Sequence, residues 1–128
     1  MSNRKVQIDG RADAVMEGLL ESNDLAADTV KKAVKQAGTT VRDEIRSNAP
    51  ERTGRYAKSW RTKTTKESSS ALEITVYSPT RYMLAHLLEH GHAMRNGGRV
   101  AAQVHIAPAE QDGIEELEEE IGRTLRHG

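Results

Sequence analysis

Three residues in the second half of the chain have the types and spacing needed to bind a metal ion. His86 and His90 are four residues apart, so on a helix both imidazoles point to one side and could reach the same cation. Glu89 lies between them and could act as a general base toward a metal-bound water. This set of residues would support metal-dependent hydrolysis.

The order H-x-x-E-H also matches the motif of one class of zinc peptidases. A third ligand should come from a later helix, where the candidates are Glu110 and the acidic run at 115–120. That segment is so highly charged that we expect it to be exposed. A zinc-dependent hydrolase therefore remains the alternative function, and adventitious metal binding by His86, His90 and His92 is favoured over a catalytic site.

Other catalytic motifs are absent from the sequence. The chain has no cysteine to serve as nucleophile or thiolate ligand, and no G-x-S-x-G elbow. Gly97 and Gly98 do not belong to a phosphate-binding loop, because no lysine followed by serine or threonine completes the motif. We expect no enzymatic activity, no catalytic or cofactor-binding residue, no metal ligand and no cofactor.

The composition predicts a thin hydrophobic core. The 128 residues fit one domain over 1–128, in which we expect 1–22 to be peripheral. Hydrophobic residues make up 36% of the chain, charged residues 30% and aromatic residues only 3%. Small domains bury a smaller share of their surface and are often completed by partners. We therefore expect a homo-oligomer or a docked subunit, even if the isolated chain is a monomer.

The charge and hydropathy patterns exclude several kinds of partner. The formal net charge is zero, which argues against bulk nucleic acid or an anionic membrane as the main partner. No apolar run approaches the roughly 20 residues of a membrane span. The first ten residues lack the apolar centre of a signal peptide, so we expect the protein to be made and used in a cytoplasm.

The first half of the chain predicts helices followed by a hairpin. Val6 and Ile8 alternate as in a short edge strand, and residues 14–20 could form a weak helix. Apolar residues then recur at steps of three and four over 24–49, which predicts a long amphipathic helix ended by Pro50. Thr53 and Gly54 mark a turn. Two segments with period-two alternation, 60–65 and 72–77, flank a serine-rich turn and predict an antiparallel hairpin.

The second half of the chain contains the residues whose types could do chemistry. Residues 81–89 could form a short helix capped by Thr80, with Gly91 as its C-terminal cap, although a strand stays open for 82–89. A flexible loop at 96–98 and a strand at 100–106 should follow. Pro108 suits the first turn of a last helix. We predict an α+β fold, a small antiparallel sheet packed against the long helix and the C-terminal helix.

Charge is distributed unevenly between two segments. Residues 41–66 contain eight basic and three acidic residues, and residues 107–128 contain seven acidic and two basic ones. The net charges are therefore +5 and −5. Two solvated faces would explain this, but so would a head-to-tail ring in which the basic segment meets the acidic helix of the next subunit. A third function, contact with DNA through 41–66, is weaker because Trp60 falls on the apolar side of its strand.

Two ordered motifs give the chain a resemblance to a known family. The first runs from a helix ending in Ala49–Pro50 through a Thr-Gly turn into a basic stretch, and the second runs from a tyrosine through L-E-x-G and a glycine-rich basic loop to a proline. The residues of the first motif are Ala49, Pro50, Thr53, Gly54, Arg55 and Ser59. Those of the second are Tyr82, Leu88, Glu89, Gly91, Gly97, Gly98, Arg99, Val100, His105, Ile106, Pro108 and Ala109.

Because the two motifs occur in this order, the chain resembles the small head–tail joining or tail-completion proteins of long-tailed bacteriophages, often described as minor tail components. The resemblance covers roughly residues 24–125. Two departures are Glu51-Arg52 before the turn, where an aspartate is frequent, and Gln103-Val104, where a proline often stands. The resemblance implies an α+β subunit of a ring in the phage neck, without cofactor or turnover. It places the protein in the host cytoplasm during assembly and then in the virion.

The same resemblance assigns structural or interface roles to one set of residues. They are Pro50, Thr53, Gly54, Arg55, Tyr82, Glu89, Gly91, Gly97, Gly98, Arg99 and Pro108. The partners implied are the connector or stopper and the tail terminator or tube, with no membrane and no specific nucleic acid. For Glu89 we expect anchoring of nearby loop amides, or an ion pair with Arg95 or Arg99.

Overall fold

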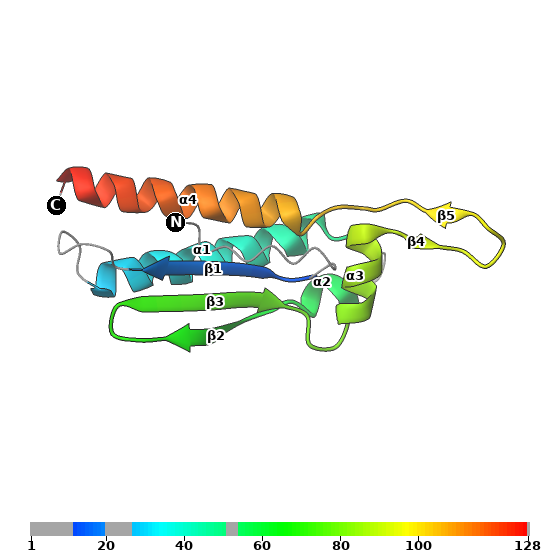
Figure 1. The fold of residues 1–128 in the computed structure, drawn as a ribbon, viewed down its shortest axis with the longest axis horizontal. Coiled ribbons are helices and arrows are strands. Elements are labelled where there is room, and N and C mark those ends of the chain that lie inside the picture. The colour runs from blue at the N-terminus through cyan, green and yellow to red at the C-terminus, as the bar shows by residue number, and fades with distance from the viewer. Residues whose placement is uncertain (1–11, 20–26, 51–53, 128) are drawn as a thin grey trace.

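The computed structural model describes residues 12–19, 27–50 and 54–127, and these form an α+β fold (Figure 1). The elements are β1 (Ala14–Leu19), α1 (Ala27–Asn48), α2 (Arg55–Lys58), β2 (Arg61–Glu67), β3 (Ala71–Tyr77), α3 (Tyr82–His90), β4 (His92–Ala93), β5 (Arg99–Val100) and α4 (Ala107–His127). A three-stranded antiparallel sheet in the order β1-β3-β2 packs with α1 and α4, which confirms the predicted fold class. The expected strand at Val6 and Ile8 lies outside the described residues.

The long helix α1 forms the centre of the core, as its sequence predicts. Seven residues of one stripe are buried: Val30, Ala33, Val34, Ala37, Gly38, Val41 and Ile45. One part of this stripe contacts β1 and β3, and another contacts α4. Because each turn offers only small or β-branched side chains, the sheet and α4 approach α1 closely.

The predicted weak helix at 14–20 is wrong, because residues Ala14–Leu19 form the strand β1. Burial alternates along it, with Ala14, Met16 and Gly18 facing the core. A Cβ built on Gly18 would lie 2.6 Å from the Cγ2 atom of Val34, so this strand runs directly against α1. Since Ala14 and Met16 have no exposed surface, this part of 1–22 is not peripheral.

The predicted hairpin is confirmed over β2 and β3. Their register pairs Thr62 with Val76 and Thr64 with Ile74, and a bulge at Thr65 interrupts it. In β3 the alternating residues Leu72, Ile74 and Val76 are buried against the helices. The strand β2 is exposed along nearly its whole length, which makes it the polar edge of the sheet.

The helix α3 resolves the choice left open for residues 82–89. Its start is not capped by Thr80, because Arg81 occupies the cap position and no side chain caps the helix. The Arg81 amide donates to Oγ of Ser78 over 3.2 Å. Its end is the expected glycine: Gly91 has a φ of 72° and donates its amide to the carbonyl of Leu87. The predicted strand at 100–106 is wrong beyond Val100, since residues 101–104 form an exposed connection and the buried His105 then leads into α4.

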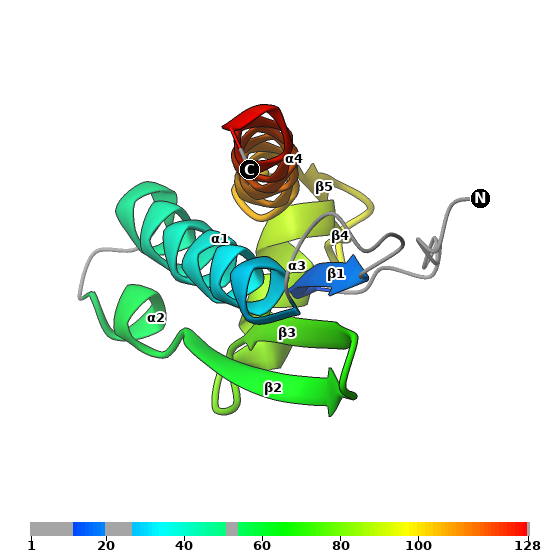
Figure 2. The same cartoon turned by 90° about the vertical axis from the view of Figure 1, so that its left-hand side faces the viewer.

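The two views agree on the arrangement of these elements. The acidic α4 and the strand β2 lie on opposite sides of the molecule, with α1 and the rest of the sheet between them (Figures 1 and 2). One end of the long axis contains α2, α3 and the start of α4, and the β4–β5 hairpin projects beyond them (Figure 1). None of the described helices is long and apolar enough to span a membrane.

Candidate functional site

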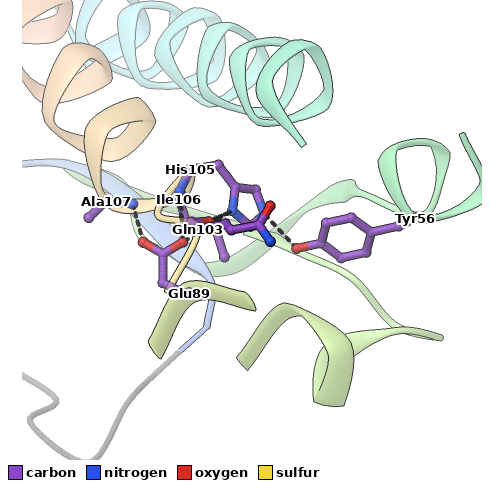
Figure 3. A network of polar contacts seen from close by, with 6 residues as sticks. All are labelled: Tyr56, Glu89, Gln103, His105, Ile106 and Ala107. Carbon is purple, nitrogen blue, oxygen red and sulfur yellow. Dashed lines mark hydrogen bonds and ion pairs between the residues drawn. The ribbon is translucent and has the colours of Figure 1, made fainter. Parts of the chain in front are cut away.

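The carboxylate of Glu89 is the centre of a buried network between α3 and α4 (Figure 3). Its Oε1 atom accepts the backbone amides of His105 and Ile106, each over 2.9 Å, and its Oε2 atom accepts the amide of Ala107, also over 2.9 Å. Glu89 itself is only 6% exposed. A single side chain, donated by another helix, therefore satisfies three adjacent N–H groups at the start of α4.

This position favours a negative charge for two physical reasons. The first N–H groups of a helix have no partner within the helix, and the helix dipole places partial positive charge there. The next residue after Ala107 is Pro108, which has no N–H and so adds no further donor. Glu89 and Pro108 together leave the beginning of α4 well satisfied, as a cap supplied from a distant part of the chain.

The side chain of His105 extends this network, and its neighbours fix its tautomer. The carbonyl of Gln103 can only accept, so Nδ1 of His105 carries a proton and donates to it over 2.8 Å. In the neutral ring Nε2 then accepts from the hydroxyl of Tyr56 over 2.7 Å. Oε1 of Glu89 also lies 3.3 Å from Nδ1. His105 is buried and is oriented from three directions.

Tyr56 connects the network to α2 and to the aromatic part of the core. It is fully buried, and its ring makes edge-on contacts with Trp60 at 6.0 Å and with His105 at 5.5 Å between centroids. The helix α2 that carries it begins after Gly54, whose φ of 80° suits glycine, and the Lys58 amide closes this turn onto the Gly54 carbonyl over 3.0 Å. The glycine turn of the first motif thus places Tyr56 against the second motif.

A second series of hydrogen bonds joins the end of α2 to the start of α3. The hydroxyl of Ser59 donates to the Tyr56 carbonyl over 2.6 Å. The hydroxyl of Ser78 must then donate to Ser59, over 2.7 Å, since Ser59 has used its only proton. Ser78 in turn accepts the Arg81 amide at the start of α3. In each of these hydrogen bonds the donor is on the side of α3 and the acceptor on the side of α2. The series fixes α3 relative to α2.

The zinc hypothesis is not supported by this geometry. The rings of His86 and His90 lie 4.9 Å apart, but both oxygens of Glu89 are occupied by the amides at the start of α4. Within the described ranges no group of three histidine, aspartate or glutamate side chains is placed to hold a metal ion. Glu89 could serve as a base only if the start of α4 were broken.

The glycines of the second motif shape the projecting hairpin. A Cβ on Gly91 would lie 2.6 Å from the carbonyl oxygen of Val100, so only glycine lets the returning strand come this close. At the tip, Gly97 has a φ of 91°, and the Met94 amide donates to the Gly98 carbonyl over 2.8 Å. Arg99 donates to the carbonyl of His90 over 3.1 Å. Of the two expected roles for Glu89, the structure shows the amide contact.

The basic segment 41–66 is spread over α1, α2 and β2, and much of it is bound within the chain. Arg42 pairs with Asp43 over 3.1 Å. Arg46 donates to the carbonyl of Trp60 over 2.7 Å, and Arg61 donates to the same oxygen over 3.1 Å. Trp60 is fully buried, as its place in the sequence pattern predicts, so it offers no stacking surface for a nucleic-acid base.

The remaining motif residues have different surroundings. Pro50 is half-buried after the end of α1, whereas Arg55 is exposed on α2. Tyr82 is 63% exposed at the start of α3. Thr53 lies outside the described residues. Spacing alone could not reveal the joining role of Tyr56 and Ser78, because their partners are far away in the sequence.

The chain is similar to a known protein family. Residues 13–91 match a family model described as "Bacteriophage HK97-gp10, putative tail-component". This chain belongs to the HK97-gp10-like family. No curated protein and no solved structure matches it.

Membership of the HK97-gp10-like family makes the protein a bacteriophage tail component and confirms the family suggested by the two motifs. Such a component acts with other phage structural proteins and belongs to the virion. The matched region begins just before β1 and ends at Gly91, which follows α3. It therefore includes Glu89 but neither the hairpin nor α4, the helix whose start Glu89 binds.

Proposed function

We propose that this phage tail component is a tail-completion or head–tail joining subunit. Copies of it would form part of a ring in the neck, between the head connector and the tail tube. The match to the HK97-gp10-like family over residues 13–91 carries this proposal, and the ordered motifs at 49–59 and 82–109 support it. Its partners would be the connector or stopper on one side and the tail terminator or tube on the other.

The distribution of charge supports contacts between copies. The acidic α4 lies on the side of the molecule opposite β2, as both views show (Figures 1 and 2). Most of the strand β2 belongs to the basic segment 41–66, and opposite charges on opposite sides would allow each copy to bind the next in the same orientation. Such heterologous contacts form a ring when the rotation between copies closes. The role is architectural, without turnover.

The motif residues would serve this role mainly through folding. Gly54, Gly91 and Gly97 hold backbone angles that suit glycine, and Glu89 with Pro108 fixes the start of α4. Arg55, Tyr82 and Arg99 have side chains exposed at the surface of the molecule. Pro50, Thr53 and Gly98 would complete the turns between these elements.

Phage carrying a stop codon early in this gene tests the neck role directly. We expect filled heads and complete tails that fail to join, and joining should be restored when purified protein is added to the mutant lysate. Electron microscopy with an antibody label should place the protein at the neck of wild-type virions. Normal joining in the mutant, or label at the distal end of the tail, would contradict the proposal.

Metal analysis tests the structural role against the zinc alternative. Protein purified without added zinc should contain no stoichiometric metal. Zinc present at one ion per chain and lost in the double variant His86→Ala, His90→Ala would contradict a purely structural function, provided that the variant keeps the wild-type circular dichroism spectrum. The histidine of the buried network, His105, is left unchanged in this experiment.

A further inference from the structure

The exposed apolar side chains of this protein gather at one end. The large hydrophobic residues that are exposed in the described part of the chain are Tyr82, Met83, Met94 and Val104, at 63%, 56%, 42% and 54%. Tyr82 and Met83 lie on α3, Met94 near the hairpin tip and Val104 on the connection to α4. Exposed apolar residues on neighbouring elements are suited to contact with a partner. We call residues 81–104 the hairpin end.

The hairpin itself projects from the body of the molecule (Figure 1). Its strands, β4 and β5, have two residues each, and a lone two-stranded hairpin is at best marginally stable in water. Inside the chain it is held at its tip by the contact between Met94 and Gly98 and at its base by the contact between Arg99 and His90. Such an element gains stability when a partner covers it.

The charge of the hairpin end is positive and unbalanced. Arg81, Arg95 and Arg99 are exposed, and none of them forms an ion pair with a carboxylate within the described ranges. The one acidic residue of this region is Glu89, which is buried and already bound to three amides. The partner that fits this end therefore carries exposed carboxylates beside apolar surface.

A surface of that kind is present on the same chain. Glu115, Glu118 and Glu119 are exposed on α4, and no basic side chain pairs with them in the described part of the chain. They are three and four residues apart on one helical face, a spacing at which like charges destabilise a helix. Ile114 and Ile121 of the same helix pack against the core and are only partly buried. A cationic partner would relieve this repulsion.

The two surfaces cannot meet within one molecule. From its first turn beside α3, α4 runs away from the hairpin toward the other end of the long axis (Figure 1). The basic residues of 41–66 are a weaker match for the acidic face, since Arg42, Arg46 and Arg61 bind groups of their own chain and Lys63 lies 4.5 Å from the centre of the Tyr77 ring. In the hairpin end Arg99 donates to a carbonyl of its own chain, which leaves the carboxylate-binding role mainly to Arg95.

We propose that the hairpin end of one copy docks on the acidic face of α4 of the next copy. Arg95 and Arg99 would face Glu115, Glu118 and Glu119, and Met94 would pack beside them. The two surfaces differ, so the contact is heterologous and repeats from copy to copy. This inference deepens the proposed ring and rests on it, because it names the parts of the chain that make the contact.

Disulfide trapping tests the contact with a clean background, since the chain has no cysteine. Met94→Cys and Glu118→Cys are made as separate variants and mixed under mild oxidation. We expect covalent dimers in the mixture, and a ladder of higher multimers from a chain that carries both substitutions. A pair at Met94→Cys and Lys66→Cys is the matched control, because Lys66 is exposed on β2 outside the proposed contact.

Three results would overturn the proposal. One is trapping by Met94→Cys alone, which would show two hairpins meeting. Another is equal trapping with the Lys66→Cys control. The third is a lack of trapping both in concentrated solution and on tails assembled from the same phage.

Charge reversal gives an independent test. The pair Arg95→Glu, Arg99→Glu should weaken self-association by about a hundredfold, because like charges then face each other. Adding Glu115→Arg, Glu118→Arg to the same chain should restore it. Failure of this rescue, with all variants showing the wild-type melting curve, would contradict the contact. Salt-sensitive binding of the wild type to duplex DNA at about 50 mM salt, lost in the arginine variant, would instead assign the hairpin end to nucleic acid.

The phage assay separates this inference from the proposed function. If Arg95→Glu, Arg99→Glu supports normal head–tail joining while the stop-codon mutant does not, the neck role stands and the docking contact is wrong. If both give normal joining, the neck role itself is wrong. Loss of joining in the arginine variant, with recovery in the four-residue swap, is the result that we expect.

Discussion

Glu89 shows how one side chain can decide the geometry of a whole junction. It is the acidic residue most suggestive of catalysis in the sequence, yet its carboxylate binds three consecutive amides of the segment that starts α4. A buried carboxylate of this kind stabilises through charge-assisted hydrogen bonds and the helix dipole. Its removal would leave two buried donors and one partly buried donor without partners.

Replacement of Glu89 should therefore be costly. Glu89→Ala leaves three N–H groups unsatisfied, each worth about 1–3 kcal/mol, so we expect a loss of roughly 3 kcal/mol or more in the free energy of unfolding. Glu89→Gln keeps one acceptor oxygen and should lose less. Chemical denaturation measures the loss, and faster hydrogen exchange at the amides of His105, Ile106 and Ala107 should accompany it.

The control for this prediction is Glu118→Ala on the exposed face of α4. It should change the free energy of unfolding by no more than about 0.5 kcal/mol. Equal losses for Glu89→Ala and Glu118→Ala would mean that the buried network adds nothing to stability.

At the scale of elements, close packing depends on glycines placed where helices and strands cross. A Cβ on Gly113 of α4 would lie 2.3 Å from Cγ2 of Val41 and 3.1 Å from Sδ of Met16. Val41 is fully buried, and its branched side chain has few alternative rotamers. The α1–α4 distance is thus set by the absence of one methyl group.

Gly113→Ala should destabilise the protein even though alanine is the better helix former. The gain of about 1 kcal/mol in helix propensity opposes an overpacking cost of about 1–3 kcal/mol, and we expect the cost to be larger. Thermal unfolding measures the difference. In a Val41→Ala background, Gly113→Ala should cost less, because the atom it meets is gone. A Gly113→Ala protein with a higher melting temperature than the wild type would contradict the close contact.

The α1–α4 contact also contains a carboxyl pair whose titration affects stability. Burial, and then the hydrogen bond and charge of Asp112, raise the pKa of Glu44 above its usual 4.5. A carboxyl group whose pKa is raised by folding lowers stability once the pH exceeds the folded value, and costs nothing below the unfolded value. The repulsion is therefore present at neutral pH and absent in acid.

Glu44→Gln should stabilise the protein at pH 7, by less than about 1 kcal/mol because the pair is near the surface. The gain should disappear as the pH is lowered below 4.5, the usual value for this group. Glu67→Gln is the control of opposite sign, because Lys31, 3.0 Å away, lowers the pKa of Glu67. This substitution should destabilise the protein at pH 7, and the destabilisation should shrink in acid. Melting curves between pH 3 and pH 7 test both; a gain for Glu44→Gln that does not depend on pH would contradict the assignment.

At the scale of the whole molecule, a chain without net charge has strongly charged parts at separate places. The acidic face of α4 and the basic hairpin end lie apart along the long axis (Figure 1). A neutral total suppresses long-range attraction to nucleic acid, whereas local charge of both signs directs copies toward one another.

Self-association should accordingly weaken as salt is added. The screening length falls from about 10 Å at 0.1 M to about 3 Å at 1 M ionic strength, so contacts between exposed arginine and glutamate residues lose most of their attraction. Sedimentation at increasing sodium chloride concentration measures this effect. The variant with reversed Arg95 and Arg99 should show little further change, and association that strengthens with salt would indicate an apolar contact instead.

The sequence by itself determined the elements whose periodicity is strong. The apolar stripe of α1, the alternation of β3 and the proline and glycine signals at Pro108 and Gly91 depend on local backbone preferences, which neighbouring residues define. Family membership also followed from ordered motifs in the sequence. The sequence did not determine β1, because Ala14, Met16 and Gly18 are small or flexible residues. Their strand conformation comes from pairing with β3 and packing on α1.

Only the tertiary structure decided what the polar residues do. His86, Glu89 and His90 follow a metal-binding pattern, but the start of α4 lies against Glu89 and occupies both of its oxygens. Tyr56 and His105 are 49 residues apart and meet through one hydrogen bond of 2.7 Å. Such contacts depend on how helices fold back on one another. Local backbone preferences do not specify which distant residues will meet.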